Sequence, residues 1–309
     1  MSEPSAPLRS PGRSWIVQIS QSGWMGRFFW CVLAGVVALL IISGYGAIVS
    51  ARRDYLHLAF LGGLAGFAAT ALGAIVAIIL RDIASRTQDI MLGFAAGMML
   101  AASSFSLILP GIEAAQQISN NQLVAASIVV LGLGLGVALM VGLDRYVPHE
   151  HLESGKRGPE ARRINRIWLF VLAITLHNLP EGMAIGVSFA TGDMKVGLPL
   201  TTAIAIQDIP EGLAVALALR VTGISALRAA LIAVGSGVME PLGATIGLGI
   251  SSSFALGYPV ALGLAAGAMI FVVSHEVIPE THRNGHETPA TLGLMLGFGV
   301  MMFLDTALG

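Results

Sequence analysis

The chain contains the segment LHNLPEG at residues 176–182 and a similar segment, IQDIPEG, at residues 206–212. Each lies within an apolar stretch long enough to span a bilayer, which takes about 20 residues. Successive spans cross a membrane in opposite directions, so an axis lying in the membrane plane is expected to relate the two segments. This pair predicts an internally symmetric, all-α polytopic membrane protein.

The overall composition agrees with a membrane protein. The 309 residues are 55% hydrophobic and 11% charged, whereas soluble domains carry about 25% charged residues. The net charge of −1 gives no electrostatic basis for binding nucleic acid. A single cysteine, Cys31, excludes an intrachain disulfide and a multi-cysteine metal site. The expected surroundings are a lipid bilayer.

Nine apolar stretches are long enough to cross that bilayer. The first, at 28–50, follows a tail at 1–27, and its length favours a retained extra helix over a cleaved signal peptide. The rest of the single transmembrane domain, 28–309, consists of eight core helices with a polar loop at 145–165. The core helices are predicted at residues 56–80, 90–110, 122–144, 166–190, 197–220, 225–250, 255–279 and 289–308.

Lysine and arginine residues predict the orientation. All 17 of them except Arg52, Arg53 and Lys195 fall on the side that holds the amino-terminal tail and the loop at 145–165. The positive-inside rule places that side in the cytoplasm. The amino terminus is therefore expected in the cytoplasm and the carboxyl terminus outside a cell membrane, the inner membrane if the source is a Gram-negative bacterium.

A second internal similarity extends the symmetry. The segment GFAAGMM at 93–99, on core helix two, matches GLAAGAM at 263–269, on core helix seven. The two helices are five positions apart in the order of spans, so they cross the membrane in opposite directions and the segments too are inverted. Core helices one to three would then mirror six to eight around a central pair, a 3+2+3 arrangement. Inverted repeats are typical of secondary transporters with a site at the membrane midplane. For this second match the alternative is a generic Gly-x-x-x-Gly packing motif.

Polar side chains gather on the central helices, where ionisable groups are costly and usually functional. His177 and Glu181 are four residues apart and share one helix face, and Gln207 and Glu211 repeat that spacing. One imidazole, amide oxygens and carboxylates suit Zn²⁺, and also Cd²⁺, Mn²⁺ or Fe²⁺. The structural alternative is a hydrogen-bond network that fixes helix packing. The predicted metal ligands are His177, Asn178, Glu181, Gln207, Asp208, Glu211 and Glu240.

Charge predicts that this site holds two ions. Glu181, Asp208, Glu211 and Glu240 would bring several negative charges into a low-dielectric region, where isolated charges are costly. Two divalent cations would neutralise four carboxylates. Glu181 and Glu211 are placed to bridge the ions.

The motif HNLPEG, followed one helix later by a second Pro-Glu-Gly, resembles the ZIP (Zrt-/Irt-like protein) family of divalent metal transporters, and in particular its prokaryotic gufA-like branch. The resemblance covers the eight core helices. It implies zinc as the transported substrate, uptake into the cytoplasm, a 3+2+3 arrangement, metal binding by the two motifs, and alternating access. Gln207 departs from the family, in which many members carry histidine at that position, and Asp208 adds a carboxylate. Metal preference is therefore left open.

Other residues with potential metal-ligand atoms are candidates for an entrance or exit pathway. Met99, Ser106, Glu113 and Asp305 are expected on the outer side of the site, and the others on the cytoplasmic side. For each, a structural or solvated role is the alternative. The complete set is Met99, Ser106, Glu113, Asp144, His275, Glu276, His286 and Asp305.

Two other functions share these residues. An intramembrane metalloprotease would also place histidine and glutamate on one face, but the string His-Glu-x-x-His does not occur in the chain. A passive metal channel could use the same ligands. We therefore expect a transporter and not an enzyme. The oligomeric state is open, with a homodimer as one expectation.

Overall fold

The computed structural model describes residues 53–80, 83–146, 149–151, 155–157, 166–221, 223–252 and 256–308. All of them belong to one compact unit, Leu40–Gly309. The predicted tail at 1–27 and the predicted first helix at 28–50 lie outside the described residues.

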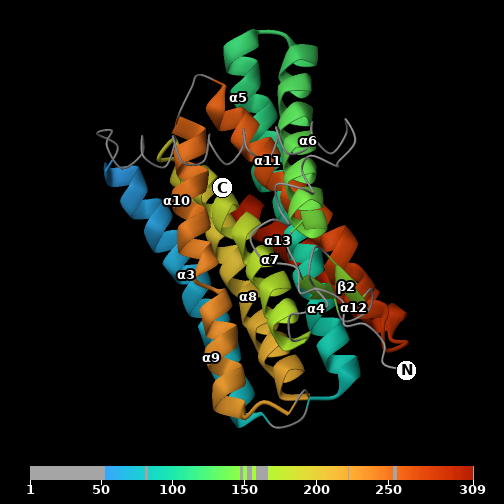
Figure 1. Ribbon diagram of the computed structural model, residues 1–309. Coiled ribbons are helices and arrows are strands. Elements are labelled where there is room, and N and C mark those ends of the chain that lie inside the picture. The colour runs from blue at the N-terminus through green and yellow to red at the C-terminus, as the bar shows by residue number, and fades with distance from the viewer. Residues whose placement is uncertain are drawn as a thin grey trace, which may run out of the picture. The chain divides into compact units, whose positions relative to one another are not determined.

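The described chain is almost entirely helical, as its long apolar stretches predict (Figure 1). Two elements, η2 and η3, are π-helical turns embedded in longer helices. The elements in chain order are α3 (Arg53–Ile79), α4 (Ser85–Ala101), η2 (Ala102–Ile108), α5 (Leu109–Ser119), α6 (Gln122–Tyr146), β1 (His149–His151), β2 (Gly155–Arg157), α7 (Arg166–Ser188), α8 (Met194–Val221), α9 (Ala226–Ser236), α10 (Met239–Ser252), α11 (Gly257–Val272), η3 (Val273–Val277), α12 (Ile278–His282) and α13 (Glu287–Leu308).

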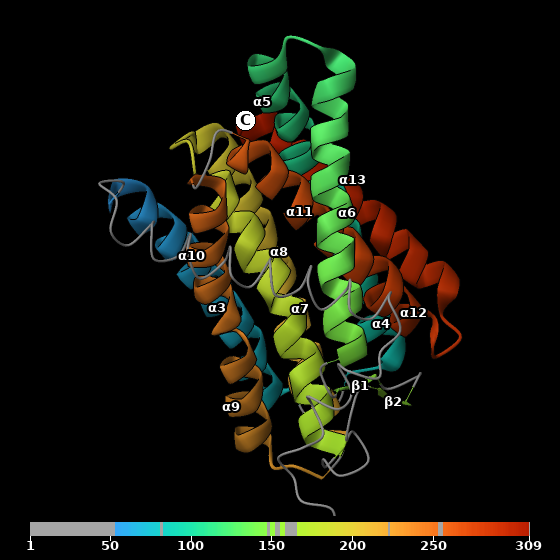
Figure 2. The same cartoon turned by 45° about the horizontal axis from the view of Figure 1, so that its top comes forward.

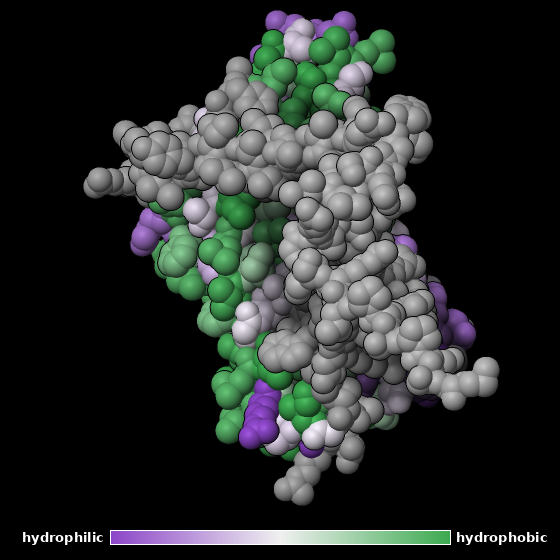
Figure 3. Space-filling view, in the orientation of Figure 1, coloured by the Kyte–Doolittle hydropathy of each residue, from purple (hydrophilic) through white to green (hydrophobic). Residues whose placement is uncertain are grey.

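Length and hydropathy identify the fold as an all-α, multi-pass membrane protein. Seven helical segments in the described chain are long and apolar enough to cross a bilayer, and α7, with 23 residues, occupies the remaining predicted core span. Large apolar side chains are exposed on the surface, among them Leu123 and Ile79. Figure 3 shows apolar residues over much of the described visible face, with hydrophilic residues at its top and bottom and at its left and right edges. Such a surface suits contact with lipid.

The predicted spans differ from the helices at two places. The span expected at 90–110 belongs to one helical segment, Ser85–Ser119, that continues through η2 into α5. The span expected at 225–250 is interrupted between α9 and α10, around Gly237. Pro241 explains the interruption, because it has no N–H to donate to the carbonyl of Gly237 and its ring crowds that group.

Figures 1 and 2 show α7 and α8 between two groups of helices. One group contains α3, α9 and α10, and the other contains α4, α6, α11 and α13. On one side α7 packs against α10 and α8 packs against α3, and on the other α4 packs against α13 and α11 against α6. The central pair therefore contacts helices from both halves of the chain.

The matched glycine segments make matching contacts. A Cβ atom on Gly93 of α4 would collide with the carbonyl oxygen of Ala290 on α13, and one on Gly263 of α11 would collide with that of Val129 on α6. Each glycine thus allows two helix backbones to approach closely. These contacts support the equivalence of the two segments, while the complete 3+2+3 arrangement stays a prediction.

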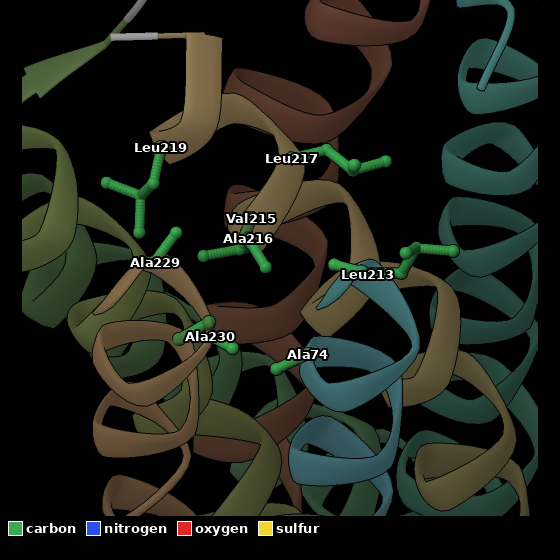
Figure 4. Packing of buried hydrophobic residues seen from close by; sticks show 10 residues of the cluster. Ala74, Leu213, Val215, Ala216, Leu217, Leu219, Ala229 and Ala230 are labelled. Carbon is green, nitrogen blue, oxygen red and sulfur yellow. The ribbon is translucent and has the colours of Figure 1, made fainter. Parts of the chain in front are cut away.

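One end of α8 is fixed to α3 and α9. Leu213 and Leu219 of α8 pack with Ala74 of α3 and with Ala229 of α9 in a buried apolar cluster (Figure 4). Near the same end, Arg220 donates to the carbonyl oxygens that close α3, at 2.8 and 2.9 Å. The three helices are therefore tied together beyond the central site.

The predicted polar loop at 145–165 contains a short hairpin. Strands β1 and β2 pair in antiparallel register, with His149 opposite Arg157 and His151 opposite Gly155. The rest of the loop, apart from the end of α6, lies outside the described residues.

Candidate metal site

Four side chains from α7 and α8 converge on one point. Nε2 of His177 lies 3.5 Å from Oε1 of Glu211. One ligand atom from each of His177, Glu181 and Glu211 lies within 4.8 Å of the others, a spacing that one metal ion could bridge. Gln207 completes the group by donating from Nε2 to Oε1 of Glu181 at 2.6 Å. The i,i+4 spacing places each pair, His177 with Glu181 and Gln207 with Glu211, on one face of its helix.

A second acidic group lies beside the first. Asp208 is 1% exposed and Glu240, near the start of α10, is 0% exposed. A Cβ atom built on Gly66 of α3 would lie 3.1 Å from Oδ2 of Asp208 and would collide with Oε2 of Glu240. Both carboxylates therefore reach the same point on α3. Asn178 of α7, the other residue predicted for the second ion, is also buried.

The unpaired atoms of the site fit a cation. Among the described residues, six buried polar side-chain atoms have no hydrogen-bond partner, and all but the Thr201 hydroxyl belong to predicted ligands. Buried polar atoms are normally paired, and leaving one unpaired costs about 1–3 kcal/mol. Metal coordination would satisfy the whole set. The atoms are Nε2 of His177, Oε2 of Glu181, Oε1 of Gln207, Oδ2 of Asp208 and Oε2 of Glu240.

The glycine of each Pro-Glu-Gly motif brings the ligand helices together. A Cβ atom on Gly182 would collide with the backbone of Glu240, and one on Gly212 with the backbone of Thr70. Helix α7 can therefore approach α10, and α8 can approach α3, closely enough for short carboxylate side chains to meet. The motifs thus contain the predicted ligands and also allow the helices to approach each other.

Two of the pathway candidates, Ser106 and Asp305, form a hydrogen bond with each other. The hydroxyl of Ser106 in η2 donates to Oδ1 of Asp305 in α13 at 2.7 Å. Met99 is buried in α4, and Glu113 is exposed on α5. Ser106 lies in a π-helical turn, a geometry that often marks functional sites.

The other pathway candidates whose side chains are described do not share one site. Glu276 of η3 approaches the central site, with Oε2 3.9 Å from Nδ1 of His177. His275 is exposed, and its ring stacks near Phe271 at 5.0 Å between centroids. His286 contacts Asp89, and its Nδ1 is 2.7 Å from Oδ2 of that carboxylate. The side chain of Asp144 lies outside those described.

Sequence reasoning did not identify three residues that these contacts involve. Thr70 and Gly66 of α3 both touch Glu240, but a threonine and a glycine in an apolar helix carry no distinguishing signal. Asp89 could have been found as a carboxylate near the start of a predicted span. It is buried and accepts hydrogen bonds from the segment that joins α12 to α13.

A helical membrane domain with buried carboxylates and a histidine on adjacent central helices is the architecture of a metal-ion transporter. Residues 146–305 match the family described as ZIP Zinc transporter. The chain belongs to this family, and the predicted resemblance is confirmed.

Its relatives include proteins from bacteria and animals. The chain is 64% identical to the zinc transporter ZIPB of Bordetella bronchiseptica over the full length of both chains. It is 44% identical to the zinc transporter GufA of Myxococcus xanthus, over 78% of this chain and 95% of that protein. Human zinc transporter ZIP11 is 31% identical, over 81% of this chain and 97% of that protein. The expected gufA-like branch is confirmed by the first two of these relatives.

Proposed function

We propose that the protein carries Zn²⁺ across a cell membrane into the cytoplasm by alternating access through the site on α7 and α8. The observation that carries the proposal is that His177, Glu181 and Gln207 each keep a buried polar atom without a hydrogen-bond partner inside an apolar helix bundle. A purely structural network would pair such atoms with one another. The names of the relatives, all zinc transporters, agree with zinc as the cargo.

The proposed site holds two ions. His177, Glu181, Gln207 and Glu211 would bind the first, and Asn178, Asp208 and Glu240 the second, with Glu181 and Glu211 as bridges. All except Glu211 are less than one-tenth exposed. Divalent cations would therefore replace water as the partners of these groups.

The positive-inside rule supports the proposed orientation of the chain in its membrane. We place the amino terminus and the β1–β2 hairpin in the cytoplasm, and the carboxyl terminus outside, in an inner membrane if the source is Gram-negative. The Ser106–Asp305 pair would then lie on the outer side and Glu276 on the inner side. Cd²⁺, Fe²⁺ and Mn²⁺ share the required ligand chemistry and are further proposed cargoes. A homodimer is the proposed assembly.

Reconstitution tests the proposal. Purified protein in liposomes should take up Zn²⁺, and Zn²⁺ on the far side should accelerate entry of labelled Zn²⁺, because a carrier exchanges ions while it reorients. Uptake without this acceleration would identify a channel. Protein that is folded but moves none of the four metals would overturn the proposal.

A further inference from the structure

The carboxylate of Glu240 accepts a hydrogen bond from Thr70, a neutral residue outside the two Pro-Glu-Gly motifs. The hydroxyl of Thr70 on α3 donates to Oε1 of Glu240 at 2.7 Å, and both side chains are buried. The other carboxylate oxygen, Oε2, has no hydrogen-bond partner. One oxygen is thus fixed and the other is left for a different partner.

Gly66 determines where that second oxygen lies. It precedes Thr70 by one helical turn, so both face the same neighbour. Oε2 of Glu240 occupies the position that a side chain on Gly66 would fill, and Oδ2 of Asp208 lies 3.1 Å from the same position. The missing side chain therefore lets the two unpaired oxygens approach each other against α3.

Thr70 also stands where the inverted repeat would place a counterpart of Glu240. The two residues are 170 positions apart, the same separation as the matched glycines Gly93 and Gly263. Gly182 approaches the carbonyl of Glu240, and Gly212 approaches the carbonyl of Thr70. A hydroxyl on one side thus faces a carboxylate on the other, and the site gains a hydrogen-bond donor without a further negative charge.

We propose that Thr70 and Gly66 are positioning residues that hold the Glu240 carboxylate with Oε2 facing Asp208, so that α3 determines how tightly the Asp208–Glu240 position binds a cation. The inference rests on the proposed function, which places a metal ion at that position. Beyond His57, α3 carries no ionisable residue as far as Ile79, so this helix adds no charge to the position.

A double-mutant cycle tests the coupling. Zn²⁺ and Cd²⁺ binding to the detergent-purified full chain would be measured by calorimetry for wild type, Thr70→Val, Glu240→Gln and the double variant. Valine keeps the shape of threonine and removes the donor. Loss of a hydrogen bond to a charged group should weaken the binding that depends on Glu240 by about tenfold or more. Because Thr70 acts through Glu240, adding Thr70→Val to Glu240→Gln should change binding by less than about twofold.

Three further variants separate positioning from packing. Thr70→Ser keeps the hydroxyl and should restore binding to within about threefold of wild type. Gly66→Ala should reproduce the loss, because its Cβ would displace Oε2 of Glu240. Thr245→Val is the matched control, since its hydroxyl donates to the carbonyl of Pro241 in its own helix, and it should bind as wild type does.

The outcomes distinguish the two proposals. Wild-type protein that binds but does not transport zinc would contradict the proposed function, and the binding cycle would still report on Thr70. If Thr70→Val binds as wild type does, if its loss adds fully to that of Glu240→Gln, or if Thr70→Ser fails as badly as valine, the positioning role is wrong.

Discussion

Gln207 of α8 donates its side-chain amide to Glu181 of α7 at 2.6 Å, across the contact between the two ligand helices. This bond fixes the orientation of both side chains. It leaves the amide oxygen of Gln207 and the second carboxylate oxygen of Glu181 without hydrogen-bond partners. An amide oxygen is a harder and weaker ligand for zinc than an imidazole nitrogen. The proposed first ion position would therefore combine one strong nitrogen ligand, His177, with oxygen ligands.

Gln207→His should strengthen zinc binding at the first position. An imidazole would replace the amide oxygen as ligand, and we expect affinity for Zn²⁺ to rise about tenfold, which corresponds to about 1.4 kcal/mol, while turnover slows because release becomes harder. Competition titration with a zinc chelator and initial uptake rates would measure the two effects. Gln207→Ala is the comparison, and histidine binding no tighter than alanine would contradict the assigned ligand role.

Glu181→Ala and Glu211→Ala should each abolish most transport. Both carboxylates lie at the convergence point with His177 and are proposed to bridge two ions. Loss of an outer-shell partner of a metal ligand costs about 10–100-fold, so loss of a ligand itself should cost at least as much. Zinc uptake into liposomes would be compared with Glu287→Ala, which alters an exposed carboxylate at the start of α13. Folded Glu181→Ala protein with near wild-type uptake would remove the site assignment.

The apolar helices and the candidate ligands could be predicted from the sequence, whereas the π-helical turns and distant contacts could not. Membrane helices were identifiable because their apolar runs are long, and His177 and Glu211 because ionisable groups are rare in such runs. Pro241 could have indicated the interruption that precedes it, because a proline has no N–H to continue the helix. The π-helical turns at η2 and η3 depend on local backbone geometry, which composition does not encode. Thr70 was missed because its role depends on its contact with Glu240, far away in the sequence.

Gly97→Ala and Gly267→Ala should both destabilise the helix bundle. A Cβ atom at Gly97 would collide with the backbone of Leu294, and one at Gly267 with the backbone of Leu133. Overpacking of this kind costs about 1–3 kcal/mol, so each variant should unfold at a lower temperature in detergent. Gly134→Ala, with no atom within 4 Å of its Cβ, should be neutral or stabilising. Equal melting temperatures for all three variants would contradict the backbone contacts.

Accessibility of introduced cysteines should reveal the proposed orientation. In a Cys31→Ser background, a cysteine at position 155 should be protected from an impermeant thiol reagent in intact cells. One in the turn at 191–195, between α7 and α8, should react, because successive spans place the two sites on opposite sides. Permeabilised cells provide the control for reactivity at position 155. Labelling of position 155 from outside intact cells would invert the proposed topology and, with it, the assignment of entrance and exit.

The site should bind two ions and release protons as it fills. Glu181, Asp208 and Glu240 are almost completely buried, and with Glu211 they can carry four negative charges. One divalent ion would leave two charges unbalanced in a low-dielectric interior, whereas two ions would leave none. In the absence of metal, protons would serve the same purpose, so binding should displace them and weaken as the pH falls. Native mass spectrometry would count bound metal in wild type, Asp208→Ala and Glu240→Gln, and calorimetry in buffers of different ionisation enthalpy would count released protons. We expect two ions in wild type and one in each variant, with fewer protons released by the variants. A single central ion in all three proteins would show that protons, not a second metal, balance the remaining carboxylates.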